Sequence, residues 1–253
     1  MRHVNKTIFA IGGTEIGPVQ PDGKTKPNPL EHVHREIINS APTASPHILY
    51  IPTAKDDRED YIAGFRYYYG TLGCQTIDVL KLLDKSTSKA EAKRKIEGAD
   101  IIYVNGGNTK RMIAWWKRYG VDSLLRAAYD RGAIMAGHSA GAICWFEYGC
   151  SDSFYKKQPF CVSALGIFPA VLCPHYDTEP VRQQALKKMM KRLPSKVAIT
   201  LDEESALKIV NDQYVVLSGG QDAKMRLAYW DHGEYRVIQP PRKGKAEPLL
   251  RHP

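Results

Sequence analysis

Short apolar runs alternate along the chain with longer stretches in which apolar residues recur at helical spacing. The short runs are typical of buried strands, and several of them end at a glycine or proline. Strands are predicted at residues 7–11, 47–52, 75–80, 100–104, 132–136, 197–201, 206–210 and 214–218. Helices are predicted at residues 31–39, 57–70, 86–97 and 110–130, the last of them interrupted near Gly120.

This alternation of strands and helices predicts βαβ units, and therefore a mostly parallel sheet with helices on both faces. The expected fold is a three-layer α/β/α sandwich. Neither a linker nor a break in composition divides the chain before about residue 240. We therefore expect one domain over residues 1–240, followed by a basic C-terminal tail over residues 241–253.

Four loops follow predicted strands and should meet at one edge of the sheet. They are Gly12-Gly13, Pro52-Thr53, Asn105–Thr109 and Gly137–Gly141. In sheets of this kind, ligands bind beyond the carboxyl ends of the strands. The functional site is therefore expected among these loops.

One of the four loops, Gly137–Gly141, reads Gly-His-Ser-Ala-Gly and fits the pattern G-x-S-x-G. An apolar strand precedes it, and the run Ala142–Phe146 after it is compatible with a helix. A tight turn from strand to helix holds such a serine in a strained conformation and exposes its hydroxyl. Ser139 is therefore the candidate nucleophile. The alternative is a serine that only caps the following helix.

A serine hydroxyl is a poor nucleophile at neutral pH and needs a general base. Among the eight histidines, His175 follows the apolar run Val171–Cys173 and Pro174, a pattern that indicates a strand end at the same sheet edge. His138 adjoins Ser139, but neighbouring side chains diverge at a sharp turn. His175 is therefore the predicted base.

An acid must orient the imidazole and stabilise its charged form. Between Ser139 and His175 the candidates are Asp152 and Glu147. Asp152 lies in a turn-like segment that positions a short carboxylate well, although an aspartate there also serves simply to stabilise a turn. Glu147 lies in the helix expected after Ser139 and points either back to the site or out to solvent. Asp177 is too close in sequence to His175 to pack against its ring.

Acyl transfer also needs hydrogen-bond donors for the oxyanion. The amide of Ala140, directly after the nucleophile, is one candidate. Gly106 or Gly107 supplies another, because the absence of side chains lets a substrate carbonyl approach the backbone. The alternative for these two glycines is a tight turn without a role in binding.

The chain of 253 residues has a formal net charge of +9, which makes a nucleic-acid partner worth testing. The excess is confined to residues 181–196 and 238–253. Neither segment interleaves aromatic residues with its basic ones, as a surface for stacking single strands would. We therefore expect a solvated helix face and a loose tail, and no nucleic-acid partner.

Other features exclude several classes of protein. The five scattered cysteines form no CxxC pair, so we expect reduced, mostly buried thiols rather than disulfides or a zinc site. No P-loop, no HExxH and no G-x-G-x-x-G is present, so no cofactor or metal is expected. We identify no signal peptide and no run of about 18 apolar residues, which predicts a cytoplasmic protein without a membrane partner.

Taken together, the motifs resemble the peptidase E family, serine dipeptidases that cleave after an N-terminal aspartate. The resemblance rests on Asn105–Thr109 (Asn-Gly-Gly-Asn-Thr), Gly137–Ala142 (Gly-His-Ser-Ala-Gly-Ala) and Pro174–Tyr176. It implies a flavodoxin-like fold related to class I glutamine amidotransferases, with Ser139 as nucleophile and His175 as base. The family's acid follows the serine at a short distance, which favours Asp152 over Glu147.

The resemblance also implies two substrate-binding residues, Arg182 and Asn108. Arg182 is the best match for the basic residue that pairs with the substrate aspartate. A guanidinium suits this role because it offers a carboxylate two parallel charged hydrogen bonds. The alternative is that Arg182 belongs only to the basic face of a helix. The loop after His175 is shorter than in the family, which indicates a divergent branch and weakens the expectation of aspartyl specificity.

The resulting hypothesis is a metal-independent serine hydrolase that cleaves short peptides, with N-terminal aspartate as one option for the first residue. A cyanophycinase-like enzyme or another amide hydrolase is a rival, and so is a non-catalytic ligand-binding module on the same fold. An amidotransferase would need a cysteine where Ser139 stands. The sequence leaves the oligomeric state open, with a homodimer as one option.

Overall fold

The computed structural model of the chain describes residues 4–83, 87–155, 158–220 and 222–251. Its larger sheet has eight strands. In chain order they are β1 (Thr7–Ile11), β2 (Ile48–Ile51), β3 (Ile77–Val79), β4 (Ile101–Val104), β5 (Ile134–His138), β10 (Ser205–Val210), β11 (Gln213–Ser218) and β14 (Lys243–Lys245). Across the sheet the order is β14-β11-β10-β1-β5-β4-β2-β3.

The strands from β1 to β3 in this order pair in parallel, whereas β10, β11 and β14 extend the sheet in antiparallel fashion. The parallel strands β1, β2, β4 and β5 are buried along their whole length. This is the burial expected for strands that are covered on both faces, and it explains why they appear in the sequence as continuous apolar runs.

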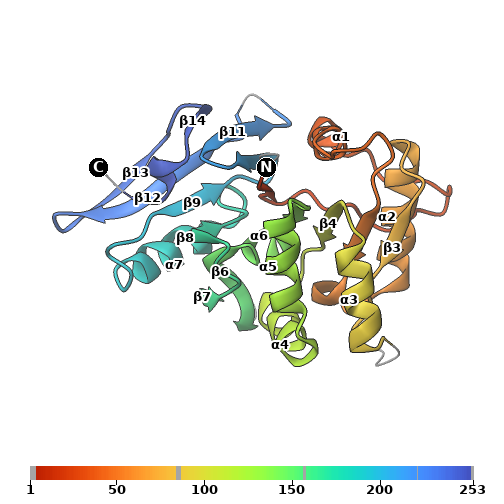
Figure 1. The fold of residues 1–253 in the computed structure, drawn as a ribbon. Coiled ribbons are helices and arrows are strands. Elements are labelled where there is room, and N and C mark those ends of the chain that lie inside the picture. Colours follow the sequence, from red (N-terminus) through yellow and green to blue (C-terminus); the bar gives the residue numbers. More distant parts are fainter. Residues whose placement is uncertain (1–3, 84–86, 156–157, 221, 252–253) are drawn as a thin grey trace.

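Helices cover both faces of the larger sheet (Figure 1). On one face lie α1 (Glu31–Asn39) and α2 (Glu59–Thr71), with the short 3-10 turn η1 (Thr53–Lys55) before α2. On the other face lie α3 (Lys89–Glu97), α4 (Thr109–Tyr119) and α5 (Val121–Arg131). Gly120, with a φ of 71°, separates α4 from α5. The predicted three-layer α/β/α arrangement is confirmed.

A second sheet of six strands was not predicted from the sequence. Its strands are β6 (Phe146–Tyr155), β7 (Gln158–Ser163), β8 (Phe168–Cys173), β9 (Ala198–Leu201), β12 (Met225–Asp231) and β13 (Glu234–Ile238), in the spatial order β13-β12-β9-β8-β6-β7. One face joins the core of the larger sheet, and the other packs against α7 (Pro180–Met190). In Figure 1 this sheet and α7 lie on the left.

The segment after the predicted nucleophile differs from the expectation of a helix through Phe146. Helix α6 spans only Ala140–Ile143, and β6 begins at Phe146. Gly149 lets β6 pack closely on α6, because a Cβ at Gly149 would lie 2.3 Å from Cγ2 of Ile143. The chain therefore leaves the first sheet at α6 and enters the second sheet at once.

The residues expected to form a loose C-terminal tail are instead part of the fold. Strand β14 pairs with β11, and the 3-10 turn η2 (Glu247–Leu249) follows it. Leu249 is fully buried in the main core, although the segment around it is basic and polar. The expectation was wrong because it rested on average composition, whereas one buried leucine and one strand pairing suffice to anchor a segment of this length.

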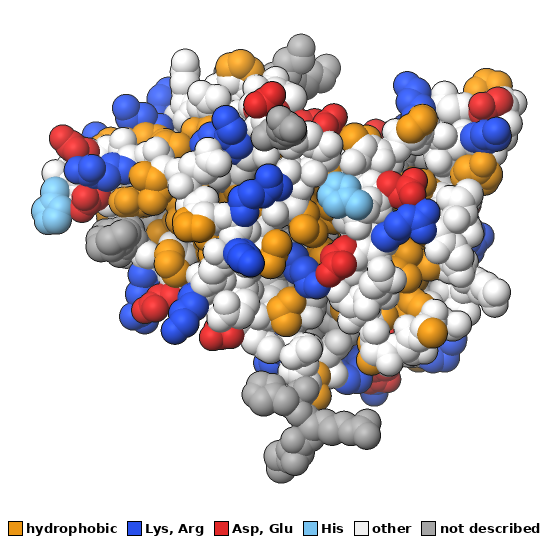
Figure 2. Space-filling view, turned by 90° about the horizontal axis from the view of Figure 1, so that it is seen from above, with side chains coloured by type: hydrophobic (Ala, Val, Ile, Leu, Met, Phe, Trp, Pro, Cys, Tyr) orange, Lys and Arg blue, Asp and Glu red, His pale blue; other side chains and the backbone are white. Residues whose placement is uncertain are grey.

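On the face seen in Figure 2, Lys and Arg side chains are interspersed with Asp and Glu. All five cysteines are free thiols, and four of them are buried. Within the described parts of the chain, no helix is long and apolar enough to cross a membrane.

The burial of Leu249 leads to a first prediction. Leu249→Ala should lower the free energy of unfolding by about 2–5 kcal/mol, because it removes buried methyl groups from a core that can only partly close. Urea denaturation measures this loss. Val237→Ala, at a position that is 41% exposed, is the matched control and should change stability by less than about 0.5 kcal/mol. Equal midpoints for Leu249→Ala and the wild-type protein would contradict the anchored C-terminus.

Candidate active site

Ser139 lies at the turn between β5 and α6, with a φ of 52° and a ψ of −115°. A positive φ is strained for a residue other than glycine. The amide of Ser139 donates to the carbonyl of Ile11 in β1, and its hydroxyl makes no capping hydrogen bond to α6. The Ser139 hydroxyl therefore does not cap α6.

The two glycines of G-x-S-x-G are needed for close packing of the backbone around Ser139. A Cβ at Gly137 would lie 2.4 Å from the carbonyl oxygen of Gly141, and a Cβ at Gly141 would lie 2.0 Å from that of Val104. Both separations are shorter than real Cβ contacts allow. The motif thus lets α6 begin directly against the end of β4.

His175 follows β8 of the second sheet and also has a positive φ, 53°. Its Nε2 atom lies 2.8 Å from Oγ of Ser139. The hydroxyl donates to this nitrogen when the imidazole carries its proton on Nδ1. The structure therefore brings together the two residues that the sequence singled out, from strands of different sheets.

Glu203 is the carboxylate that contacts the other side of the imidazole. Its Oε2 lies 2.5 Å from Nδ1 of His175 and also accepts from the hydroxyl of Thr178 at 3.3 Å. Oε1 accepts from the amide of Thr14 at 3.0 Å. Gly13 makes room for this carboxylate, because a Cβ there would lie 2.1 Å from Cδ of Glu203.

The electrostatics of Glu203 keep it ionised. Partial burial works to raise the pKa of this carboxyl group, but the hydrogen bond and charge of His175, together with donors from Thr14 and Thr178, hold the pKa below its ordinary value. An ionised carboxylate at this position accepts a hydrogen bond from Nδ1–H of His175. It also stabilises any positive charge that develops on the ring.

Neither carboxylate predicted from the sequence contacts His175. Glu147 forms an ion pair of 2.5 Å with Lys196, and Asp152 lies 3.8 Å from Arg182. Both predicted carboxylates lie between Ser139 and His175 in the sequence, whereas Glu203 lies beyond them. A usable signal was present, because residues 197–201 were predicted as a strand and Glu203 follows its carboxyl end.

The pairing of strands in the second sheet explains why a residue that follows β9 lies close to His175. Strands β8 and β9 are parallel neighbours, with Cys173 opposite Thr200. The residues that follow them, His175 and Glu203, therefore leave the sheet at the same edge. Asp177, considered too local to serve as the acid, accepts a hydrogen bond from the amide of Glu203 at 2.8 Å and so supports its turn.

The candidate oxyanion donors differ in whether their amides are free. The amide of Gly106 donates to Nε2 of His138 at 3.1 Å, so it is already used. The amides of Gly107 and Ala140 donate to no acceptor in the described part of the chain. Gly107 lines the cavity that contains Ser139, and Ala140 adjoins the serine.

The two predicted substrate-binding residues already have partners within the chain. Oδ1 of Asn108 caps α4 by accepting from the amide of Arg111, and Nδ2 donates to the carbonyl of Ser153 at 3.3 Å. Arg182 is 3% exposed, donates to Glu179 at 2.6 Å and donates to the carbonyl of Cys150 at 2.7 Å. Arg182 lines the cavity beside Ser139.

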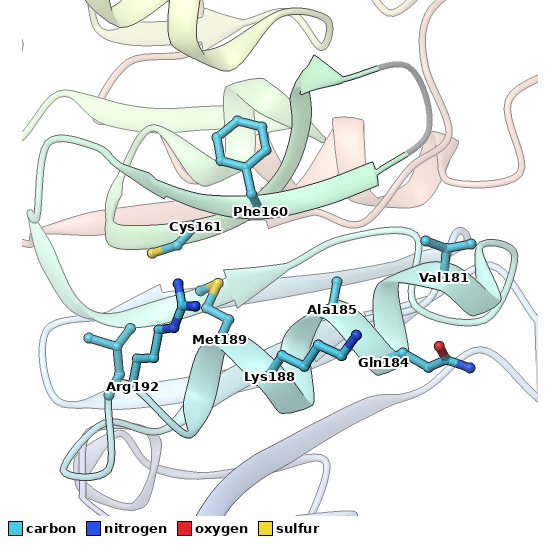
Figure 3. A pocket seen from close by; sticks show the side chains of 9 residues that line it. Phe160, Cys161, Val181, Gln184, Ala185, Lys188, Met189 and Arg192 are labelled. Atoms are coloured by element: carbon cyan, nitrogen blue, oxygen red, sulfur yellow. The ribbon is translucent and has the colours of Figure 1, made fainter.

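The cavity at Ser139 has a volume of about 340 Å³, and Ser139, His175 and Glu203 all line it. A larger cavity of about 540 Å³ lies between β7 and α7, and Figure 3 shows Cys161 on the strand and Lys188 on the helix among its lining residues. Among the described residues, its lining contains no serine, histidine or carboxylate, and burial raises the pKa of the Cys161 thiol. It therefore offers no hydroxyl–imidazole–carboxylate arrangement of the kind found at Ser139.

No group of three or more His, Cys, Asp or Glu side chains in the described ranges is arranged to hold a metal ion. The chemistry available at Ser139 is that of a hydroxyl beside an imidazole and a carboxylate. This combination activates a nucleophile by removing its proton.

Comparisons with known proteins identify the family to which the chain belongs. The model of peptidase family S51 matches residues 22–217. The uncharacterized peptidase YgaJ of Bacillus subtilis (strain 168) is 33% identical over 208 residues, which cover 82% of this chain and 85% of that protein. Peptidase E of Streptomyces coelicolor (strain ATCC BAA-471 / A3(2) / M145) is 27% identical over 205 residues, which cover 78% of this chain and 80% of the relative.

The fold also has solved relatives. The crystal structure of a peptidase from an acI-B1 Actinobacterium matches with a TM-score of 0.70 and 18% sequence identity, and the match covers 96% of this chain and 98% of that one. At this identity the similarity shows a common fold. Because the family model spans most of the chain and the Bacillus subtilis relative matches over most of its length, the chain belongs to peptidase family S51.

Proposed function

We propose that the protein is a serine peptidase in which Ser139 is the nucleophile, His175 the general base and Glu203 the acid that orients the base. The observation that carries this proposal is the continuous hydrogen-bonded line from Oγ of Ser139 through both nitrogens of His175 to Glu203. Glu203 thus takes the role of the acid that the sequence predicts for Asp152 or Glu147, both of which have other partners.

The reaction begins when Oγ of Ser139 attacks the carbonyl carbon of a peptide bond and its proton passes to Nε2 of His175. The carboxylate of Glu203 stabilises the imidazolium that forms. The amides of Gly107 and Ala140 donate to the oxyanion of the tetrahedral intermediate. His175 then gives the proton to the amine nitrogen, the carbon–nitrogen bond breaks, and an acyl-enzyme ester remains. Water hydrolyses the ester with His175 again as base, and Ser139 regains its proton.

Short peptides are the substrate class that fits the cavity volume of about 340 Å³. Both cations of the cavity are already paired, Lys55 with Glu15 at 2.7 Å and Arg182 with Glu179 at 2.6 Å. A substrate aspartate would compete with Glu179, and with Asp152 at 3.8 Å, for the guanidinium of Arg182. Aspartyl specificity is therefore not favoured in the wild-type protein. The ion pair with Glu179 limits how readily Arg182 can bind a substrate carboxylate.

The role of Ser139 is tested by covalent labelling with a fluorophosphonate probe. The wild-type protein should be labelled on Ser139, and Ser139→Ala should abolish labelling and lower kcat for a short peptide by about 10⁶-fold, because the nucleophile is lost. Mass spectrometry identifies the labelled residue. A folded wild-type protein that reacts with no such probe would point to a non-catalytic ligand-binding module instead.

The choice of acid is tested by three variants that each remove one negative charge. Glu203→Gln should lower kcat by about 10⁴-fold, because His175 loses the partner that holds its tautomer and stabilises its charge. Asp152→Asn and Glu147→Gln are the matched comparisons, with losses below about tenfold. A larger loss in Asp152→Asn than in Glu203→Gln would reverse the assignment.

The competition at Arg182 is tested by Glu179→Gln. Removal of the Glu179 charge should raise kcat/KM for Asp-Xaa relative to Ala-Xaa dipeptides by about tenfold, because the guanidinium becomes available to a substrate carboxylate. The double variant Glu179→Gln/Arg182→Gln should lose this gain. A wild-type preference for Asp-Xaa that Glu179→Gln leaves unchanged would contradict the competition.

A further inference from the structure

His138 is a buried imidazole between the end of β5 and the loop after β4. It is 2% exposed, precedes Ser139 directly, and takes no part in the reaction steps above. Its Nε2 atom lies 3.1 Å from the amide nitrogen of Gly106, and its Nδ1 atom lies 3.3 Å from the hydroxyl of Tyr103. A backbone amide only donates, so Nε2 is the acceptor. The neutral ring therefore carries its proton on Nδ1, and Nδ1–H donates a hydrogen bond to the hydroxyl oxygen of Tyr103.

The surroundings of His138 keep the ring neutral. Burial lowers the pKa of His138 well below its ordinary value, and the charges of Lys55, His175 and His34 act in the same direction. The facing carboxylate of Glu15 is 3.9 Å from Nε2 and is itself paired with Lys55 at 2.7 Å. A protonated ring would place an N–H against the amide of Gly106, so only the neutral form makes the observed contact.

The loop that His138 holds is clamped on both sides of Gly107. On one side, a Cβ at Gly106 would lie 2.6 Å from Nε2 of His138, so only glycine lets the backbone come this close to the ring. On the other side, the amide of Asn108 donates to the carbonyl of Ala54 at 2.8 Å. Gly107 has a φ of 137°, and a Cβ there would lie 2.1 Å from the same carbonyl oxygen. The peptide units next to Gly107 are therefore fixed, while its own amide has no acceptor in the described part of the chain.

We propose that His138 is a positioning residue, whose neutral Nε2 holds the amide of Gly106 so that the amide of Gly107 is oriented as an oxyanion donor beside Ser139. The inference rests on the proposed function, since it assigns Gly107 to the oxyanion of that reaction. It also separates the two adjacent glycines by role: Gly106 is held by the protein, and Gly107 is left for the substrate. Without an acceptor at Nε2, the Gly106 amide would be a buried donor without a partner, and the loop would turn to satisfy it.

The test compares His138→Gln with His138→Leu. The side-chain oxygen of glutamine reaches about as far from the backbone as Nε2 of histidine and accepts a hydrogen bond, whereas leucine fills similar space and accepts none. His138→Leu should lower kcat by about 10²–10³-fold, the effect of losing one oxyanion donor, with a much smaller change in KM. The rate constant for fluorophosphonate labelling of Ser139 should fall in parallel. His138→Gln should recover most of both losses.

Tyr103→Phe is the matched control, because it removes the partner of Nδ1 and leaves the Nε2 contact in place. It should lower kcat by less than about tenfold. Thermal unfolding of each variant separates loss of stability from loss of rate. If His138→Leu keeps kcat within about threefold of the wild-type value, or if Gln and Leu lose the same activity and the same stability, the positioning role is overturned.

Hydrogen exchange of the Gly106 amide, followed by NMR, tests the contact independently of activity. This amide should be protected in the wild-type protein and in His138→Gln and should exchange faster in His138→Leu. If the wild-type protein is never labelled on Ser139, the proposed function fails even though this exchange pattern holds. If Ser139 is labelled but the Gly106 amide exchanges equally fast in all three proteins, the positioning role alone fails.

Discussion

The contact between Oγ of Ser139 and Nε2 of His175 joins the two sheets of the molecule at one point. Ser139 leaves the larger sheet after β5, and His175 leaves the second sheet after β8. Both have a positive φ, which costs about 1–3 kcal/mol for each residue and persists only where the surrounding structure compels it. The compelling structure is the core that the two sheets share, in which Ile143, Phe146 and Leu172 are buried.

Glycines make this junction sterically feasible. Gly137 and Gly141 allow α6 to begin against β4, and Gly12 and Gly13 allow the first loop to lie against Asp202 and Glu203. A Cβ at Gly12, Gly137 or Gly141 would come within 2.4 Å of a backbone carbonyl oxygen, and a Cβ at Gly13 would lie 2.1 Å from Cδ of Glu203. The motif around Ser139 and the Gly-Gly loop near the N-terminus are thus two parts of one packing requirement, because the first positions the nucleophile and the second positions the acid.

The two histidines near Ser139, His138 and His175, differ in burial and in hydrogen-bond partners, and these differences suit them to different roles. His138 is almost completely buried, which favours the uncharged ring, and its Nε2 accepts from a backbone amide. His175 is 18% exposed and contacts an ionised carboxylate, so a proton gained from Ser139 has a counter-charge to face.

The sequence by itself predicted the parallel core and the proposed nucleophile, because buried strands appear as apolar runs and the tight turn at Ser139 needs glycine at positions 137 and 141. It also identified His175, since an apolar run that stops at a proline marks a strand end. Only the tertiary structure showed which carboxylate contacts His175, which partners Arg182 has and how the C-terminal segment packs. Strands β6, β12 and β13 mix polar and apolar residues, so no local pattern revealed the second sheet. Glu203 reaches His175 because β8 and β9 are neighbours in that sheet, and the neighbours of a strand depend on pairing between distant segments, which a pattern along the chain does not contain.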